Sequence, residues 1–191
     1  MAPAKHDRGD PRSGGLDSLV IREAKPNDVR LLADLIREAF QTVADRFGLT
    51  PENSPTHPSN CAPAWTLAAF KKGVRYFIAE AGGEASGCVA LERTGPEVCY
   101  LERLAVLPRF RRQGLGQALV RHALSQARVW GASRVELGLI AQQSELLRFY
   151  ERLGFTLLRT ARFDHLLFEV AFMAQTLQPE RPRSAWTHEL S

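Results

Sequence analysis

Apolar residues recur every three to four positions in several stretches of the chain, which is the spacing of an amphipathic helix. The longest stretch runs from Val29 to Phe47, after Asn27 or Asp28 as the N-cap, and Gly48 ends it. A short helix is expected around 65–70, a longer one from 114 to 130 and another over 144–153.

Short runs before, between and after these helices are expected to form β-strands. Gly82-Gly83 predicts a tight hairpin turn, and Gly95-Pro96 predicts the turn after it. The expected strands cover residues 19–22, 75–80, 85–92, 97–106, 134–140, 156–163 and 165–173.

The order of these elements predicts an α/β (α+β) fold. A strand, a helix and a second strand between 97 and 140 form a crossover, which makes that strand pair parallel, whereas the short connections elsewhere favour antiparallel pairing. We therefore expect a mixed, mostly antiparallel twisted sheet of six to seven strands, with a central parallel pair and helices on both faces.

The length of 191 residues suits one domain, which we place at 18–177. The polar segment 1–17 lacks the apolar stretch of a secretory signal, and we expect both this segment and the tail 178–191 to be flexible. No apolar run approaches the ~20 residues that a membrane span requires. A cytoplasmic protein without a membrane partner is the expectation.

The composition disfavours other classes of function. The three cysteines, Cys61, Cys88 and Cys99, lack the paired spacing of a zinc site or a disulfide framework, so no metal is expected. The net charge of +4 would suit nucleic acid, but the basic residues are scattered and no basic run contains interleaved aromatic residues. A nucleic-acid partner is therefore not expected.

The segment 104–117 joins the end of an apolar strand to a turn with two glycines and the start of a helix. Gly114 and Gly116 let an anion approach the backbone closely, and the first turn of a helix offers N–H groups that have no intrahelical partner. Arg109, Arg111 and Arg112 add positive charge. The segment therefore predicts a phosphate-binding turn.

Two common phosphate-binding motifs do not match this segment. A P-loop requires Lys and then Ser or Thr after its second glycine, and no Lys follows Gly114 or Gly116. A dinucleotide-binding fingerprint requires a third small residue, where this chain has Leu119, and an acidic residue at a suitable distance, which the chain lacks.

Two runs of residues together resemble the GCN5-related N-acetyltransferase (GNAT) superfamily. The run 111–116, Arg-Arg-Gln-Gly-Leu-Gly, is similar to the superfamily signature Arg/Gln-x-x-Gly-x-Gly/Ala, and an apolar strand and a proline precede it here. The run 149–155, Phe-Tyr-Glu-Arg-Leu-Gly-Phe, resembles the second landmark, a helix that ends in Gly-Phe. The resemblance covers about 19–175 and is closest between 100 and 155.

The resemblance implies that acetyl-CoA is the cosubstrate. The strand residues Leu104, Ala105 and Val106 would bind the pantetheine arm, and Gln143 and Tyr150 would lie near the cofactor. The diphosphate would bind at the glycine turn, which comprises Arg111, Arg112, Gln113, Gly114, Leu115, Gly116 and Gln117.

The activity that the resemblance implies is that of an acyltransferase, which moves acetyl from acetyl-CoA to an amine within one ternary complex. Tyr150 is the candidate proton donor to the CoA thiolate, because the pKa of a tyrosine, about 10, exceeds the roughly 8.5 of a thiol. Glu102, His57 and water are all candidates for the base, although Glu102 could equally form a structural ion pair. Gly138 stands where some relatives carry a glutamate, and Gln143 where many carry an asparagine.

A non-catalytic acyl-CoA sensor is the alternative function, and Tyr150 favours catalysis because a sensor needs no proton donor. The acceptor would be an amine on a small molecule or a protein, and the resemblance implies that the proline-rich loop 49–63 helps to wall its site. A monomer or a homodimer is expected. The acids that could attract a cationic amine are Asp34, Glu38, Asp45 and Glu52.

Overall fold

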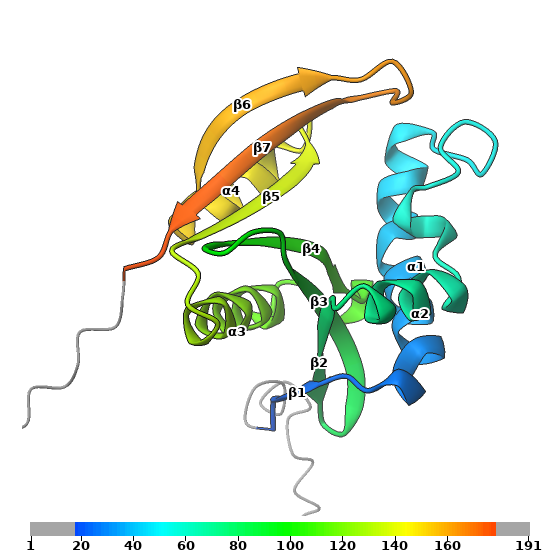
Figure 1. The fold of residues 1–191 in the computed structure, drawn as a ribbon. Helices are drawn as coiled ribbons and strands as arrows, with labels where there is room; N and C mark the ends of the chain where they lie inside the picture. Colours follow the sequence, from blue (N-terminus) through cyan, green and yellow to red (C-terminus); the bar gives the residue numbers. More distant parts are fainter. Residues whose placement is uncertain (1–17, 179–191) are drawn as a thin grey trace, which may run out of the picture. The chain divides into compact units, whose positions relative to one another are not determined.

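The computed structural model describes residues 18–178, which form a seven-stranded sheet and four α-helices (Figure 1). The strands are β1 (Val20–Glu23), β2 (Arg75–Ala81), β3 (Glu84–Arg93), β4 (Val98–Val106), β5 (Arg134–Ile140), β6 (Thr156–Arg162) and β7 (Glu169–Thr176). The helices are α1 (Val29–Phe47), α2 (Pro63–Lys71), α3 (Leu115–Val129) and α4 (Ser144–Arg152), with the single 3₁₀ turns η1 (Pro26–Asp28), η2 (Pro58–Asn60) and η3 (Pro108–Phe110). The segment 1–17 and the tail beyond Gln178, both expected to be flexible, lie outside the described residues.

The strands follow the order β1-β2-β3-β4-β5-β7-β6. β4 and β5 pair in parallel from Val98↔Arg134 to Tyr100↔Glu136. The pairs β1–β2, β5–β7 and β6–β7 are antiparallel. The predicted mixed sheet with one parallel pair is therefore confirmed.

The chain packs as two compact units. The first comprises the residues up to Ala90 together with Arg103–Val120, and the second comprises Leu91–Glu102 together with the residues from Arg121 onward. The elements β3, β4 and α3 therefore contribute residues to both units. The assignment of 18–177 to one acyltransferase domain stays a prediction.

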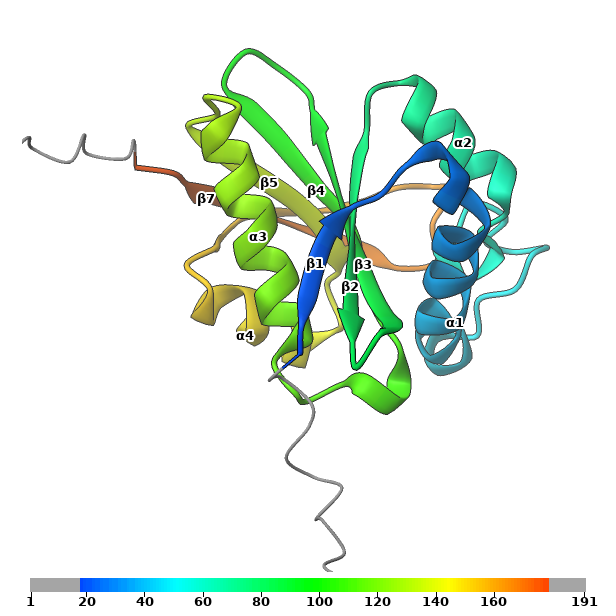
Figure 2. The ribbon, with the colours of Figure 1, turned by 90° about the horizontal axis from the view of Figure 1, so that it is seen from below.

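In the first unit, α1 and α2 cover one face of β2 and β3 (Figure 2). Leu32 and Ile36 of α1 are fully buried in one apolar cluster with Ile78 of β2 and Cys88 of β3. Burial of a leucine or isoleucine side chain of this kind stabilises a fold by about 1.5–3 kcal/mol. Gly48 ends α1, as expected, and it does so in the left-handed conformation, with φ of 62°.

The other face of β3 receives the start of α3. Gly87 precedes Cys88 and so faces away from α1, and a Cβ atom at this position would lie 2.5 Å from the Ala105 carbonyl oxygen and 3.4 Å from Leu119 of α3. Only glycine permits this close approach of β3 to β4 and α3. Helices therefore cover both faces of the strands in the first unit.

In the second unit, β5 lies between β4 and β7, and β6 is the edge strand that pairs with β7 (Figure 1). The last strand was expected at 165–173 but spans Glu169–Thr176, so this prediction was wrong in its boundaries. The Leu166 N–H donates to the Phe163 carbonyl and closes a turn there, which makes the connection longer than a tight hairpin turn. The Leu177 N–H then donates to the Ser133 carbonyl beyond the end of β7.

Candidate functional site

The glycine turn, residues 111–117, has the backbone form that an anion-binding turn requires. Arg112 and Gly114 adopt left-handed conformations, with φ of 62° and 83°, and α3 begins at Leu115. The first intrahelical bond of this turn runs from the Ala118 N–H to the Gly114 carbonyl. The N–H groups before Ala118 precede that ladder, and residues 111–114 are exposed to solvent.

The Arg111 side chain is held by the protein itself. Its guanidinium donates to the Val106 carbonyl at 3.0 Å, to Thr42 Oγ1 at 3.0 Å and to the Ala39 carbonyl at 2.7 Å. Partial burial among these neutral acceptors lowers the pKa of Arg111. The side chain therefore holds the end of β4 against α1 and is not available to an anion. The Arg111 backbone N–H donates to the Pro108 carbonyl at 3.3 Å.

The neighbouring side chains at 109, 112 and 113 differ in whether the protein already supplies them with hydrogen-bond or ion-pair partners. Arg109 forms ion pairs with Glu38 at 3.0 Å and with Glu84 at 2.6 Å, and Gln113 donates to the Arg109 carbonyl at 3.1 Å. Arg112, in contrast, is exposed and makes no hydrogen bond or ion pair with any residue of the range 18–178. Among the three arginines predicted to supply charge, Arg112 is the one whose guanidinium is available.

The strand residues expected to bind pantetheine lie at the end of β4. Ala105 is buried in the apolar cluster of the first unit, whereas Leu104 and Val106 are half-buried. The recorded pairing of β4 with β5 ends at Tyr100↔Glu136, although β5 continues to pair with β7 as far as Ile140↔Val170. Leu104–Val106 thus follow the point at which the parallel ladder stops.

Tyr150 lies in an aromatic cluster of the second unit. Only 5% of the residue is exposed, and its ring packs edge to face against Phe149 and Phe155, with centroids 5.1 and 5.4 Å away. Burial, and to a smaller degree the nearby Tyr100, raise the pKa of Tyr150 well above its ordinary value. Tyr150 therefore stays protonated at neutral pH, as a proton donor must.

Tyr100 was missed in the sequence analysis, and the structure places it beside Gly138. A Cβ atom at Gly138 would lie 2.7 Å from the Tyr100 hydroxyl, so the missing side chain at 138 makes room for this tyrosine. Burial, followed by the charge of Glu102, raises the pKa of Tyr100. A glycine in the interior of a strand was the one sequence signal of such a close approach.

Glu102 and Gln143, the two remaining predicted residues of the second unit, are both half-buried. Glu102 acts electrostatically on Tyr100, and Tyr100 acts on Tyr150. Gln143 occupies the N-cap position of α4, where its carbonyl accepts from the Leu146 and Leu147 N–H groups and its side chain makes no capping bond. The structure thus groups Glu102, Tyr100 and Tyr150 within one unit.

The His57 ring forms its hydrogen bonds within the proline-rich loop, to Ser59. Its Nδ1 lies 2.8 Å from Ser59 Oγ and accepts from the Ser59 N–H at 3.3 Å, and its ring meets Phe40 edge to face. The residue is 7% exposed, and burial lowers its pKa, to which the charge of Arg103 also contributes. A neutral imidazole that caps η2 is a structural feature of the proline-rich loop.

The four acids that could attract a cationic amine all have partners in the first unit. Asp34 pairs with Arg37, Glu38 pairs with Arg109, and Asp45 accepts from Gln41 at 2.8 Å. Glu52 is exposed on the loop after α1, and a hydrogen bond with the Thr50 side chain lowers its pKa.

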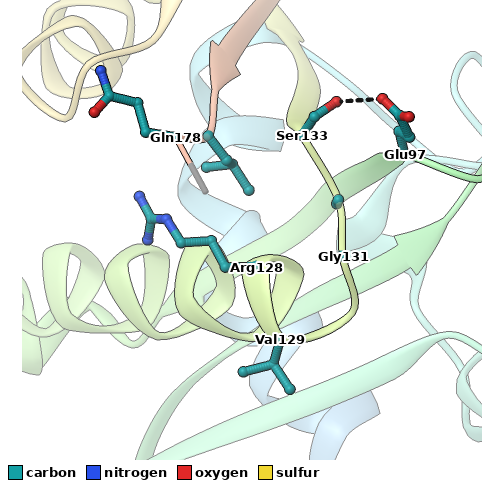
Figure 3. Close-up of a pocket in the computed structure, with 8 residues that line it drawn as sticks. Glu97, Arg128, Val129, Gly131, Ser133 and Gln178 are labelled. Atoms are coloured by element: carbon teal, nitrogen blue, oxygen red, sulfur yellow. Dashed lines mark hydrogen bonds between the residues drawn. The ribbon is translucent and has the colours of Figure 1, made fainter. Parts of the chain in front are cut away.

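The second unit also contains a cavity of about 360 Å³ near the end of α3, shown in Figure 3. Ser133 donates to Glu97 at 2.9 Å on its wall. None of the predicted site residues lines it. The lining residues are Glu97, Arg128, Val129, Gly131, Ala132, Ser133, Leu177 and Gln178.

Residues 18–178 contain no group of three or more His, Cys, Asp or Glu side chains arranged to hold a metal ion. Among the same residues, no helix is both long and apolar enough to span a membrane.

The chain belongs to the acetyltransferase (GNAT) family, whose family model matches residues 30–155. Among curated proteins it is similar to the uncharacterized N-acetyltransferase YjgM of Escherichia coli. The two are 29% identical over 141 residues, which make up 72% of this chain and 82% of that protein.

Solved acetyltransferases share the fold. The PaiA N-acetyltransferase from Thermoplasma acidophilum, solved in complex with coenzyme A, is 18% identical with a TM-score of 0.69, over 84% of this chain and 99% of that one. YncA from Salmonella typhimurium, solved with its cofactor acetyl-CoA, is 20% identical with a TM-score of 0.64, over 87% and 98% of the two chains. The predicted GNAT membership and fold are thus confirmed.

Proposed function

We propose that this chain is an N-acetyltransferase that moves an acetyl group from acetyl-CoA to an amine acceptor. The observation that carries the proposal is the glycine turn, in which exposed residues and two left-handed backbone conformations precede α3 in a member of the GNAT family. Such a turn suits a diphosphate, because its N–H groups and the helix dipole both favour negative charge.

The proposed cofactor contacts follow from this turn. The backbone of 111–117 would bind the diphosphate, and the Arg112 guanidinium would add the one charge-assisted contact that the described arginines of the turn leave available. Leu104, Ala105 and Val106 would hold the pantetheine arm through the backbone of β4. Arg111 would act indirectly, because its side chain fixes the end of β4 to α1.

Tyr150 and Glu102 supply the proposed proton chemistry. The amine nitrogen attacks the thioester carbonyl, the carbon–sulfur bond of the tetrahedral intermediate breaks, and Tyr150 donates its hydroxyl proton to the departing thiolate. Glu102, directly or through water, takes the proton that the amine loses and releases it to solvent, and solvent reprotonates Tyr150. The raised pKa of Tyr150 supports its role, because the residue enters each cycle protonated.

The test is a screen of primary amines with purified protein and acetyl-CoA, read by thiol release and by a mass increase of one acetyl group on the amine. Transfer to at least one class of amine is the expected result. Binding of acetyl-CoA without any amine-dependent thiol release would contradict catalysis and point to the non-catalytic acyl-CoA sensor.

A further inference from the structure

Arg103 combines a left-handed backbone with a guanidinium that pairs with no acid among residues 18–178. Its φ of 55° is one of two positive values found for non-glycine residues of 18–178, the other being that of Arg112 in the glycine turn. Left-handed non-glycine residues cost roughly 1–3 kcal/mol and occur mostly where function requires them. The Arg103 side chain is half-buried, yet it makes no hydrogen bond or ion pair with a residue that the structure describes.

The charge of Arg103 acts on the side of β4 that faces α1 and the proline-rich loop. Ala105, two positions further along β4, belongs to the apolar cluster with α1, and the Arg103 carbonyl oxygen lies 3.9 Å from the Sγ atom of Cys88, another member of that cluster. The pKa of His57 is lowered mainly by burial and that of Cys61 is raised mainly by burial, and the Arg103 charge lowers both. The guanidinium therefore lies near residues 57–61.

Two neighbouring arginines of the first unit already have partners. Arg37 donates to the Cys61 carbonyl and pairs with Asp34, and Arg109 pairs with Glu38 and Glu84. Asp34 and Glu38, two of the four acids that could have attracted a cationic amine, are thereby engaged in ion pairs. Arg103 differs from both arginines, because no acid among the described residues pairs with it.

We propose that Arg103 binds an anionic group on the amine acceptor, which makes the substrates of this enzyme amines that carry a carboxylate. The inference rests on the proposed function and names its acceptor class. The planar guanidinium matches a carboxylate in a bidentate pair, and partial burial makes such a pair stronger than one on an open surface. Arg103 also directly precedes the segment 104–106 that is proposed to hold the pantetheine arm.

The experiment compares matched acceptors with wild-type protein and the variants Arg103→Gln and Arg103→Lys. The acceptors are α-amino acids, the corresponding α-amino acid carboxamides, and alkyl diamines. The expected result is that wild-type protein prefers the carboxylates by about 10-fold or more in kcat/KM. Arg103→Gln should lower kcat/KM for the carboxylates by about 10- to 100-fold, mainly through a higher acceptor KM, as the loss of a charge-assisted hydrogen bond predicts. Arg103→Lys should recover part of this loss, because it keeps the charge.

Arg121→Gln is the matched control, because it removes one exposed arginine of α3 and should leave the acceptor preference unchanged. The inference is overturned if carboxamides or diamines are acetylated as well as carboxylates. It is also overturned if Arg103→Gln affects carboxylates and carboxamides equally, or raises the KM of acetyl-CoA instead. Absence of transfer to every amine would instead contradict the proposed function itself.

Discussion

The guanidinium of Arg111 donates a 2.7 Å hydrogen bond to the Ala39 carbonyl, 72 positions earlier in the chain. Two further bonds, to Thr42 and to the Val106 carbonyl, complete its set of partners. The first residue of the GNAT signature in this chain thus fixes the strand end from which the glycine turn departs. Under the proposed function, the contacts with phosphate would come from the backbone of the turn and from Arg112.

Arg111→Gln should therefore act first on stability. Removal of the three bonds leaves the Ala39 and Val106 carbonyls without this donor, at an expected cost of about 1–2 kcal/mol in the free energy of unfolding. Urea denaturation measures this cost. Arg112→Gln is the control and should change the unfolding free energy by less than about 0.5 kcal/mol, because the side chain is exposed. Equal effects of the two substitutions would contradict the structural role of Arg111.

Gly138→Ala should destabilise the second unit, because the new Cβ atom would meet the Tyr100 hydroxyl at 2.7 Å. The expected loss is about 1–3 kcal/mol, the usual size for overpacking. The double variant Gly138→Ala with Tyr100→Phe removes the clashing oxygen and should recover more than half of the loss. A double-mutant cycle in which the two effects simply add would show that the residues do not meet.

Tyr150→Phe tests the proton donor. The aromatic ring and its packing against Phe149 and Phe155 are retained, so the melting temperature and the affinity for coenzyme A should change little. The rate of the chemical step should fall by about 100-fold or more, within the range for loss of a general acid. Single-turnover kinetics measure this step. An unchanged rate would exclude Tyr150 as the proton donor and leave it only a role in packing.

The lowered pKa of His57 predicts that stability depends on pH in the acid range. In the unfolded chain the imidazole binds a proton below about pH 6.5, whereas the buried His57 resists it. The unfolded state then binds more protons, so the free energy of unfolding should fall as pH drops from about 6.5 toward 5. His57→Asn keeps an acceptor for the Ser59 N–H and should flatten this part of the profile. Identical slopes for the two proteins would exclude His57 as their cause.

The sequence was sufficient to predict the elements and the glycine turn because their signals are local. Gly48 and Gly114 adopt left-handed conformations next to helix ends, and at such positions a glycine in the sequence is by itself enough to indicate the backbone conformation. The hydrogen bonds of the Arg111 guanidinium to α1 could not be predicted, because the partners, Thr42 and Ala39, are 69 and 72 positions away. Nor could the contact of Tyr100 with Gly138, which depends on how β4 and β5 pack, or the isolated charge of Arg103.

Isothermal titration of the purified chain with coenzyme A measures whether the glycine turn binds this cofactor. Saturable binding at one site is expected in the wild-type protein. Binding should be at least 10-fold weaker in Gly114→Asp, which places a negative charge and a strained side chain at the left-handed position of the turn. If the wild-type protein binds no coenzyme A at millimolar concentration, the glycine turn is not a coenzyme A site and the proposed function is wrong.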